Sequence, residues 1–208
     1  MNSRIAVCDY GVGNLRSVER ALVNAGATVS ITRDPEEIDA ADGVVLPGVG
    51  AFGAATEALT LTGLGDAVVR AAASGRPLLG VCLGHQLLFD WSEESGGRAG
   101  LGLLPGRIVR LGPERGKVPH MGWNRLHIVR DHALLDGIGD GAFVYFVHSY
   151  TALADPGDVV AVTDHGGEVV AVCARDNVVG TQFHPEKSGP DGLRLYANFV
   201  QLCARAAV

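Results

Sequence analysis

The sequence predicts an α/β fold, with a mostly parallel central sheet, helices on both faces and antiparallel strands added in the second half. In the first half of the chain, short aliphatic and β-branched runs alternate with segments of helical spacing, as in parallel sheets. In the second half, strand-like runs follow one another with turn signals between them. The chain has 208 residues, 47% of them hydrophobic, so it can bury a substantial core, and we expect one domain spanning 1–208.

The elements of the first half are expected in alternating order. One helix should run from Asn14, a suitable N-cap, to a stop at Gly26, and another should cover 83–91. The segment 51–73 should be helical, with an interruption around Gly63. Aliphatic and β-branched runs predict strands at 5–8, 28–32, 43–46 and 77–81.

The second half is expected to consist mainly of strands. The segment 164–167, Asp-His-Gly-Gly, is typical of a hairpin turn and favours antiparallel pairing. A helix over 193–202 should close the chain. Strand-like runs lie at 108–109, 126–129, 143–147, 159–162, 169–173 and 178–183.

Charge and cysteine usage narrow the class of protein. The net charge of −6 gives no electrostatic reason to expect a nucleic acid or an anionic membrane as partner. The four cysteines form no CxxC pair, so we expect neither a disulfide framework nor a metal site, and the sequence indicates no cofactor. The first residues lead directly into a strand without a secretory signal, and no apolar run is long enough for a bilayer. We therefore expect a cytoplasmic protein.

The most specific local pattern is Gly-Val-Cys-Leu-Gly at 80–84, between a predicted strand and a predicted helix. This is the nucleophile-elbow pattern with Cys82 in place of serine, and its glycines allow the sharp turn. The thiol would lie near a helix N-terminus, whose positive end favours the thiolate. The alternative is a buried free cysteine without chemistry, which is how we interpret Cys8, Cys173 and Cys203.

A thiol nucleophile needs a base, and the base needs a group that orients it. His184 follows the end of a predicted strand, and Glu186 lies two residues later, so both side chains can project to the same side. The alternative is a loop histidine beside a surface glutamate. His85 is too close to Cys82 along the elbow to act as the base, and His148 has no carboxylate nearby in sequence.

Acyl transfer also needs donors for the developing oxyanion. The elbow supplies the backbone N–H of Leu83. The glycine-rich turn at 47–50 is the candidate for a second donor, and we predict that the N–H of Val49 completes the oxyanion hole. The alternative is an ordinary βα loop. We also hypothesise that the flanking glycines let this peptide flip when a partner binds.

Several segments together carry a resemblance that covers nearly the whole chain. They are DYGVGNLRSV at 9–18, LPGVGAF at 46–52, VPHMGWN at 118–124, VHSY at 147–150 and TQFHPEKSG at 181–189. With the elbow, they make the chain resemble the triad-type (class I) glutamine amidotransferases, and more particularly the glutaminase subunits of imidazole glycerol phosphate synthase.

The resemblance implies the chemistry of a glutaminase. Cys82 would attack the amide carbon of glutamine and form a glutamyl thioester, His184 would protonate the leaving ammonia and then activate water, and Glu186 would orient His184. Residues matching positions near bound glutamine are Gly48, Gly50, Gln86, Ser149 and Tyr150. Ammonia would pass to a barrel-shaped cyclase subunit, forming a heterodimer that serves histidine biosynthesis. Candidates for that interface are Asn14, Trp123, Asn124, Tyr145 and Lys187, although Trp123 could instead belong to the core.

Four alternatives remain open from the sequence. The same chemistry could serve anthranilate, aminodeoxychorismate, guanylate or pyridoxal phosphate synthesis. The segment 11–16 nearly fits the dinucleotide-binding pattern G-x-G-x-x-G, but Arg16 occupies the third glycine position, so a dehydrogenase is disfavoured. A non-enzymatic binding partner would not need an intact Cys82, His184 and Glu186. A cysteine peptidase would use the same three groups.

Overall fold

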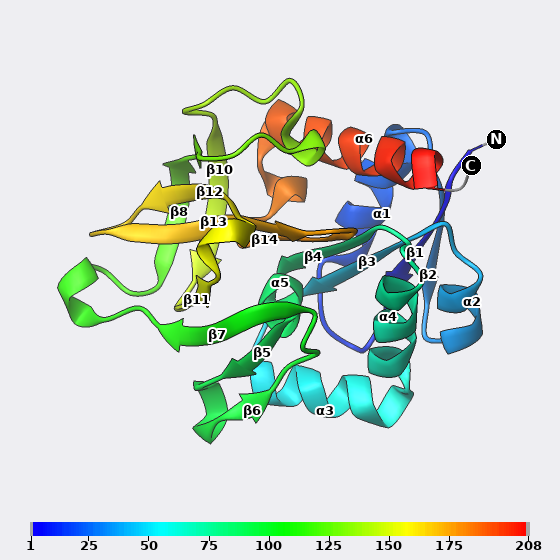
Figure 1. The fold of residues 1–208 in the computed structure, drawn as a ribbon, viewed down its shortest axis with the longest axis horizontal. Coiled ribbons are helices and arrows are strands. Elements are labelled where there is room, and N and C mark those ends of the chain that lie inside the picture. The colour runs from blue at the N-terminus through cyan, green and yellow to red at the C-terminus, as the bar shows by residue number, and fades with distance from the viewer. Residues whose placement is uncertain (1, 207–208) are drawn as a thin grey trace.

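The central layer of the fold is a single eight-stranded sheet (Figure 1). The computed structural model describes residues 2–206. Five strands of the sheet are parallel, and three antiparallel strands extend it at one edge. In spatial order they are β2 (Thr28–Thr32), β1 (Arg4–Cys8), β3 (Gly43–Gly48), β4 (Leu78–Cys82), β14 (Val178–Thr181), β13 (Glu168–Arg175), β12 (Val159–Asp164) and β9 (His127–Ile128). The predicted α/β fold class is confirmed.

Helices cover both faces of this sheet, as Figure 1 shows. On one face lie α1 (Leu15–Asn24) and α6 (Gly189–Ala206), and on the other lie α2 (Pro35–Asp39), α3 (Phe52–Thr62), α4 (Leu64–Ala73) and α5 (Leu83–Leu87). Strand β1 shows how one strand serves two cores. Ile5 and Val7 pack with α1 and α6, whereas Ala6 and Cys8 pack with the helices of the other face. This alternation follows from the two-residue period of a strand.

Two smaller sheets stand beside the central one. One pairs β8 (His120–Arg125) with β10 (Phe143–His148). The other has the order β11 (Tyr150–Ala154), β7 (Leu104–Arg110), β5 (Phe89–Ser92) and β6 (Arg98–Ala99). Short 3-10 turns connect these elements: η1 (Glu94–Gly96), η2 (Pro113–Arg115), η3 (Ala133–Leu135), η4 (Pro156–Asp158) and η5 (Pro185–Lys187). Within residues 2–206, no helix combines the length and the apolarity that crossing a membrane requires.

One local expectation is wrong, and a second is confirmed only in position. The helix expected over 83–91 ends at Leu87, because Phe89 begins strand β5 and pairs with Leu104 of β7. Tertiary pairing there overrides the local helical pattern. Asn14 lies at the N-cap position of α1, but its side chain makes no capping bond, and its carbonyl oxygen accepts from the amides of Ser17 and Val18.

The sheet brings three strand ends together at one edge. Gly48 at the end of β3 pairs with Cys82 at the end of β4, and Val81 of β4 pairs with Thr181 of β14. The chain continues from these ends into the loop before α3, into α5 and into η5. In parallel α/β sheets, ligands bind outside the carboxyl ends of the strands. This edge is therefore where the predicted site residues should meet.

Candidate active site

Cys82 lies at a sharp turn between β4 and α5. Its backbone has φ 55° and ψ −108°, an uncommon conformation for a residue with a side chain. The turn fits only because small residues surround it. A Cβ atom added at Gly84 would collide with the carbonyl oxygen of Leu46, and one added at Gly80 would lie 2.7 Å from the carbonyl oxygen of Gly84. The strand–turn–helix context expected of a nucleophile elbow is therefore present.

The side chains of His184 and Glu186 form a buried pair. The His184 Nδ1–H donates to Glu186 Oε1 over 2.8 Å, and both side chains are only 2% exposed. The other carboxylate oxygen accepts from the hydroxyl of Tyr196 at 3.5 Å. The backbone of this turn is fixed as well, because the His184 amide donates to the carbonyl oxygen of Tyr145 and the Ser188 hydroxyl donates to the carbonyl oxygen of His184. The imidazole is thus held in one orientation.

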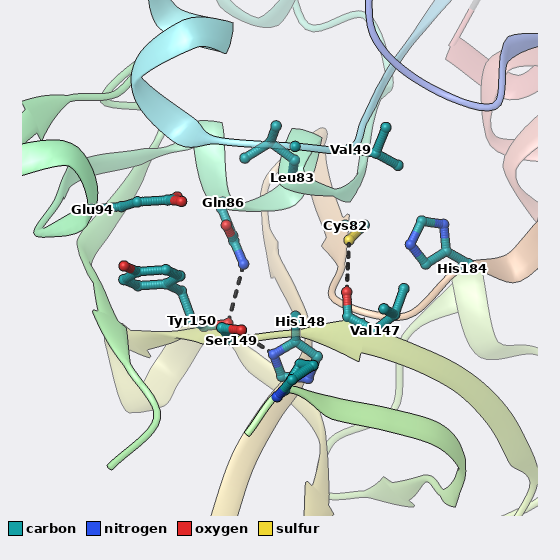
Figure 2. Close-up of a pocket in the computed structure, with 12 residues that line it drawn as sticks. Val49, Cys82, Leu83, Gln86, Glu94, Val147, His148, Ser149, Tyr150 and His184 are labelled. Carbon is teal, nitrogen blue, oxygen red and sulfur yellow. Dashed lines mark hydrogen bonds between the residues drawn. The ribbon is translucent and has the colours of Figure 1, made fainter. Parts of the chain in front are cut away.

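The second nitrogen of His184 is left for Cys82. His184 Nε2 is buried and makes no hydrogen bond to any residue in 2–206. Both side chains line the same pocket, and Figure 2 shows the imidazole ring beside the sulfur, with none of the other side chains drawn there between the two. Burial alone would lower the pKa of His184, but its interactions with the nearby Cys82 and Glu186 outweigh burial and raise that pKa from 6.5 to about 9. The three predicted triad residues therefore converge.

The Cys82 sulfur also lies near polar groups that were not predicted from the sequence. The thiol lies 4.0 Å from the carbonyl oxygen of Val147, to which it can donate. The amide Nε2 of Gln182 lies 3.9 Å from the sulfur. Gln182 is in turn oriented by Gln86, whose Nε2 donates to Gln182 Oε1 over 3.0 Å and to the carbonyl oxygen of Tyr150 over 3.1 Å. Gln182 precedes His184 by two residues, but no local pattern assigns it this contact.

The pocket beside Cys82 has a volume of about 350 Å³, within the size range of small-molecule sites. Most of the residues expected around the substrate line it, namely Val49, Gly50, Leu83, Gln86, Ser149 and Tyr150. Gly48 does not. It lies behind the wall, where a Cβ atom would meet the side chain of Leu83. Val49 and Leu83, the two residues predicted to supply oxyanion donors, lie on the same side of Cys82, above it in Figure 2.

Four lining residues were not predicted from the sequence, namely Glu94, Pro119, Val147 and His148. Glu94 matters most because it is the one carboxylate among the lining residues. It comes from the short turn η1, and its Oε2 accepts from the amide of Phe52 at the start of α3, over 3.0 Å. That bond ties η1 to the loop containing Val49. No spacing in the sequence connects these two segments, so only the fold could identify Glu94.

The two competing histidines are engaged elsewhere. His85 is fully buried, packs edge-on against Phe89, and burial lowers its pKa to about 3. His148 lines the pocket, but its Nδ1 bonds to the carbonyl oxygen of Tyr150 over 2.8 Å, and burial lowers its pKa to about 3. Both rings are therefore neutral near neutral pH. Among the residues of the described part of the chain, no cluster of three His, Cys, Asp or Glu side chains could hold a metal ion.

Several of the residues expected to contact a partner share one surface on β8 and β10. Trp123 is 54% exposed and packs edge-on against Tyr145, with 6.2 Å between ring centroids. The Lys187 ammonium lies 5.6 Å from the centre of the Tyr145 ring, and the neighbouring Met121 is 59% exposed. The alternative that Trp123 belongs to the core is therefore wrong. Asn124 points to the other side of β8, where it bonds to His120.

Comparison with known proteins identifies the class. Residues 6–202 match the family described as glutamine amidotransferase class-I. Because the match covers nearly all of the chain, the chain belongs to this family. Solved structures agree at the level of fold. A Thermoplasma acidophilum protein described as a putative GMP synthase subunit has a TM-score of 0.74 at 22% identity, covering 99% of this chain and 96% of that one. PurLQS from Thermotoga maritima has a TM-score of 0.75 at 20% identity, covering 97% and 99%.

Closer relatives carry the name imidazole glycerol phosphate synthase subunit HisH. The Halobacterium salinarum protein is 56% identical over 208 residues, covering 96% of this chain and 94% of that protein. The proteins of Archaeoglobus fulgidus and Desulfitobacterium hafniense are each 50% identical, covering 97% and 94% of this chain and 100% and 92% of their own lengths. At this identity and coverage, the chain belongs within its class to the HisH subunits.

Proposed function

We propose that this glutamine amidotransferase hydrolyses glutamine to glutamate and ammonia with Cys82, His184 and Glu186 as its catalytic triad. One observation carries the proposal. A buried imidazole bonds to a carboxylate through one nitrogen and presents the other to a cysteine at a nucleophile elbow, all in one pocket. Membership of the HisH family supports it and disfavours the dehydrogenase, peptidase and non-enzymatic alternatives.

The triad's protons balance over two steps. The Cys82 thiolate attacks the amide carbon of glutamine, and the oxyanion collapses with transfer of the Nε2 proton of His184 to the departing nitrogen, which leaves ammonia and a glutamyl thioester. Neutral His184 then takes a proton from water, and the hydroxide attacks the thioester carbon. Collapse restores the thiolate and the imidazolium and releases the product, whose new carboxyl group gives its proton to solvent to become glutamate. The raised pKa of His184 supports its protonated form at the start of the cycle.

The pocket wall supports binding of the rest of the substrate. We infer that the backbone N–H groups of Leu83 and Val49 stabilise the oxyanion. The carboxylate of Glu94 has the charge needed to pair with the α-ammonium group of glutamine. The backbone of Ser149 and Tyr150 and the side chain of Gln86 would contact the remaining polar groups, and Gly48 and Gly50 would shape the loop behind them.

A partner is needed to use the ammonia. The HisH relatives are named as subunits of imidazole glycerol phosphate synthase. We infer a heterodimer in which the cyclase subunit receives ammonia and yields imidazole glycerol phosphate and an aminoimidazole carboxamide ribotide. Transfer of ammonia to the cyclase without exposure to bulk water avoids its protonation to ammonium, which is a poor nucleophile. The exposed aromatic surface of Trp123 and Tyr145, with Lys187 beside it, has the character of an interface hot spot. Asn14, at the start of α1, and Asn124, on the other side of β8, are further candidates for contact with the cyclase subunit.

Two further expectations extend this proposal. The central sheet includes strands from both halves of the chain, which supports one domain over 1–208. The four cysteines are buried thiols without disulfide partners, which is typical of a reducing compartment and supports a cytoplasmic location.

The test is a pair of cysteine variants in complex with the cyclase subunit. Cys82→Ala should abolish glutamine-dependent synthesis and leave ammonia-dependent synthesis intact, because the acceptor site belongs to the partner. Cys173→Ala, at a buried cysteine of β13 outside the pocket, is the matched control and should retain both activities. Persistent glutamine-dependent synthesis in Cys82→Ala would refute the mechanism.

A further inference from the structure

A chain of hydrogen bonds leads from strand β8 to the wall of the glutamine pocket. The Asn124 amide nitrogen lies 3.1 Å from His120 Nε2, and His120 Nδ1 lies 2.9 Å from His148 Nε2. His148 Nδ1 lies 2.8 Å from the carbonyl oxygen of Tyr150, a pocket residue (Figure 2). His120 and His148 are both buried, with 4% and 6% exposure. Every ring nitrogen of the two histidines is used.

The direction of each hydrogen bond follows from the acceptor at the end of the chain, the carbonyl oxygen of Tyr150. A carbonyl oxygen only accepts, so His148 Nδ1 carries the proton that bonds to Tyr150. Burial lowers the pKa of His148 to about 3 and that of His120 to about 4, so both rings are neutral and each has one donor and one acceptor. His148 Nε2 must then accept from His120 Nδ1–H. The remaining nitrogen of His120 accepts from the amide of Asn124.

The chain continues beyond Tyr150 to the nucleophile. The same Tyr150 carbonyl oxygen accepts from Gln86 Nε2 at 3.1 Å, and Gln86 Nε2 also donates to Gln182 Oε1 at 3.0 Å. With its oxygen engaged, Gln182 turns its nitrogen toward the Cys82 sulfur, 3.9 Å away. We call the bonded series Asn124–His120–His148–Tyr150 the relay. The Tyr150 carbonyl oxygen therefore accepts one hydrogen bond from the relay and one from Gln86 in the pocket wall, and the orientation of this carbonyl fixes that of Gln86.

We propose that His120 and His148 are positioning residues that hold the Tyr150 carbonyl and Gln86 in the geometry that binds glutamine. The inference rests on the proposed glutaminase function. Tyr150 and Gln86 line the pocket, whereas the relay reaches Cys82 only through Gln182, whose amide nitrogen lies 3.9 Å from the sulfur. The relay contacts neither His184 nor the predicted oxyanion donors. Its loss therefore weakens glutamine binding more than it slows the chemical step, and raises KM with little change in kcat.

A neighbouring histidine supplies the control. His165 stacks on the His120 ring, with 4.2 Å between centroids, but its Nε2 bonds to the carbonyl oxygen of Lys117 and it has no place in the relay. If His120 acts only through packing, changes at His165 should matter as much as changes at His120. If His120 acts through its Nδ1 proton, only changes at His120 that remove this donor should matter.

The experiment compares four variants in complex with the cyclase subunit, measuring glutamine KM and kcat and ammonia-dependent synthesis. H120F keeps an aromatic ring but loses the donor, and H120N loses the ring but places an amide N–H near the Nδ1 position. H120Q lacks the ring as H120N does but moves the amide one carbon further, so it replaces H120F should that variant not fold. We expect H120F and H120Q to raise the glutamine KM roughly tenfold, because a buried acceptor loses its donor. H120N and the control H165F should stay within about twofold of wild type by the same reasoning.

Each outcome decides between a positioning role and simple packing. A wild-type glutamine KM in H120F or H120Q would overturn the positioning role. An equal rise of the glutamine KM in H120N and H120Q would also overturn it, because it would indicate that His120 acts only through packing. A wild-type complex without glutamine turnover would instead overturn the proposed function, and this inference with it. Ammonia-dependent synthesis should be unchanged throughout, since the relay serves only the glutamine site.

Discussion

Replacing Glu186 with glutamine tests the role of the carboxylate with minimal change of shape. Glu186 Oε1 accepts from His184 Nδ1 at 2.8 Å, and both side chains are 2% exposed, so solvent cannot substitute for the lost charge. The carbonyl oxygen of a glutamine side chain can occupy the same place and accept the same proton. The substitution E186Q thus removes a negative charge and keeps the hydrogen bond.

The expected loss of free energy follows from the change in the kind of hydrogen bond that His184 makes. A hydrogen bond to a charged group contributes about 1.5–3 kcal/mol and a neutral one about 0.5–1.5 kcal/mol, so the substitution loses about 1–2 kcal/mol. Since about 1.4 kcal/mol corresponds to a factor of ten, kcat for glutamine should fall roughly five- to thirtyfold. The pKa of His184 should also fall below about 9, because Glu186 is one of the two groups that raise it. Glutamine KM should change little, since Glu186 does not line the pocket.

The assay is steady-state glutamine hydrolysis by the complex with the cyclase subunit, with ammonia-dependent synthesis measured in parallel. Glu57→Gln, at an exposed glutamate on α3 that does not line the pocket, removes the same charge and should leave kcat unchanged. A wild-type kcat in E186Q would refute the orienting role of the carboxylate. A loss that appears equally in ammonia-dependent synthesis would indicate damage to the fold or the interface.

Three further predictions test charge, interface and packing. The pKa of His184 is raised from 6.5 to about 9, so its protonated form stabilises the fold fully below pH 6.5. Chemical denaturation should show that this contribution, about 3 kcal/mol, is lost as pH rises through 9. A free energy of unfolding that does not change over this pH range would contradict the prediction. Trp123→Ala should raise the Kd for the cyclase subunit by at least about tenfold in a titration, whereas Trp91→Ala, at an exposed tryptophan on β5, should not; equal effects would contradict the interface. Gly84→Ala should destabilise the fold by about 3 kcal/mol or more in denaturant unfolding, because its Cβ meets the backbone of β3, while Gly139→Ala, in open space, should be tolerated.

Local sequence patterns could predict those parts of the fold whose secondary structure depends on neighbouring residues. Alternating strands and helices predicted four of the parallel strands, β1 to β4, because each βα unit has its own periodicity and turn. The parallel pairing of β14 with β4 was not predicted, because β14 lies in the half of the chain where antiparallel strands were expected. Strand β5 was missed because Phe89–Ser92 continue the helical spacing of α5 and become a strand only by pairing with β7. Strand β8, with the exposed Trp123, was likewise missed because its strand conformation depends on pairing with β10.

For the site, the sequence by itself determined the elements of the chemistry: a cysteine at an elbow, with a histidine and a glutamate two residues apart at a strand end. These patterns are recognisable because the backbone geometry of each is set by its own neighbours. Only the tertiary structure decided which groups complete the site. His120 and His148 are 28 residues apart and Gln86 and Gln182 are 96 apart, and their bonds exist only because folding buries both partners together. Hydrogen-bond direction and pKa depend on that burial and on partners distant in sequence, so local patterns do not encode them.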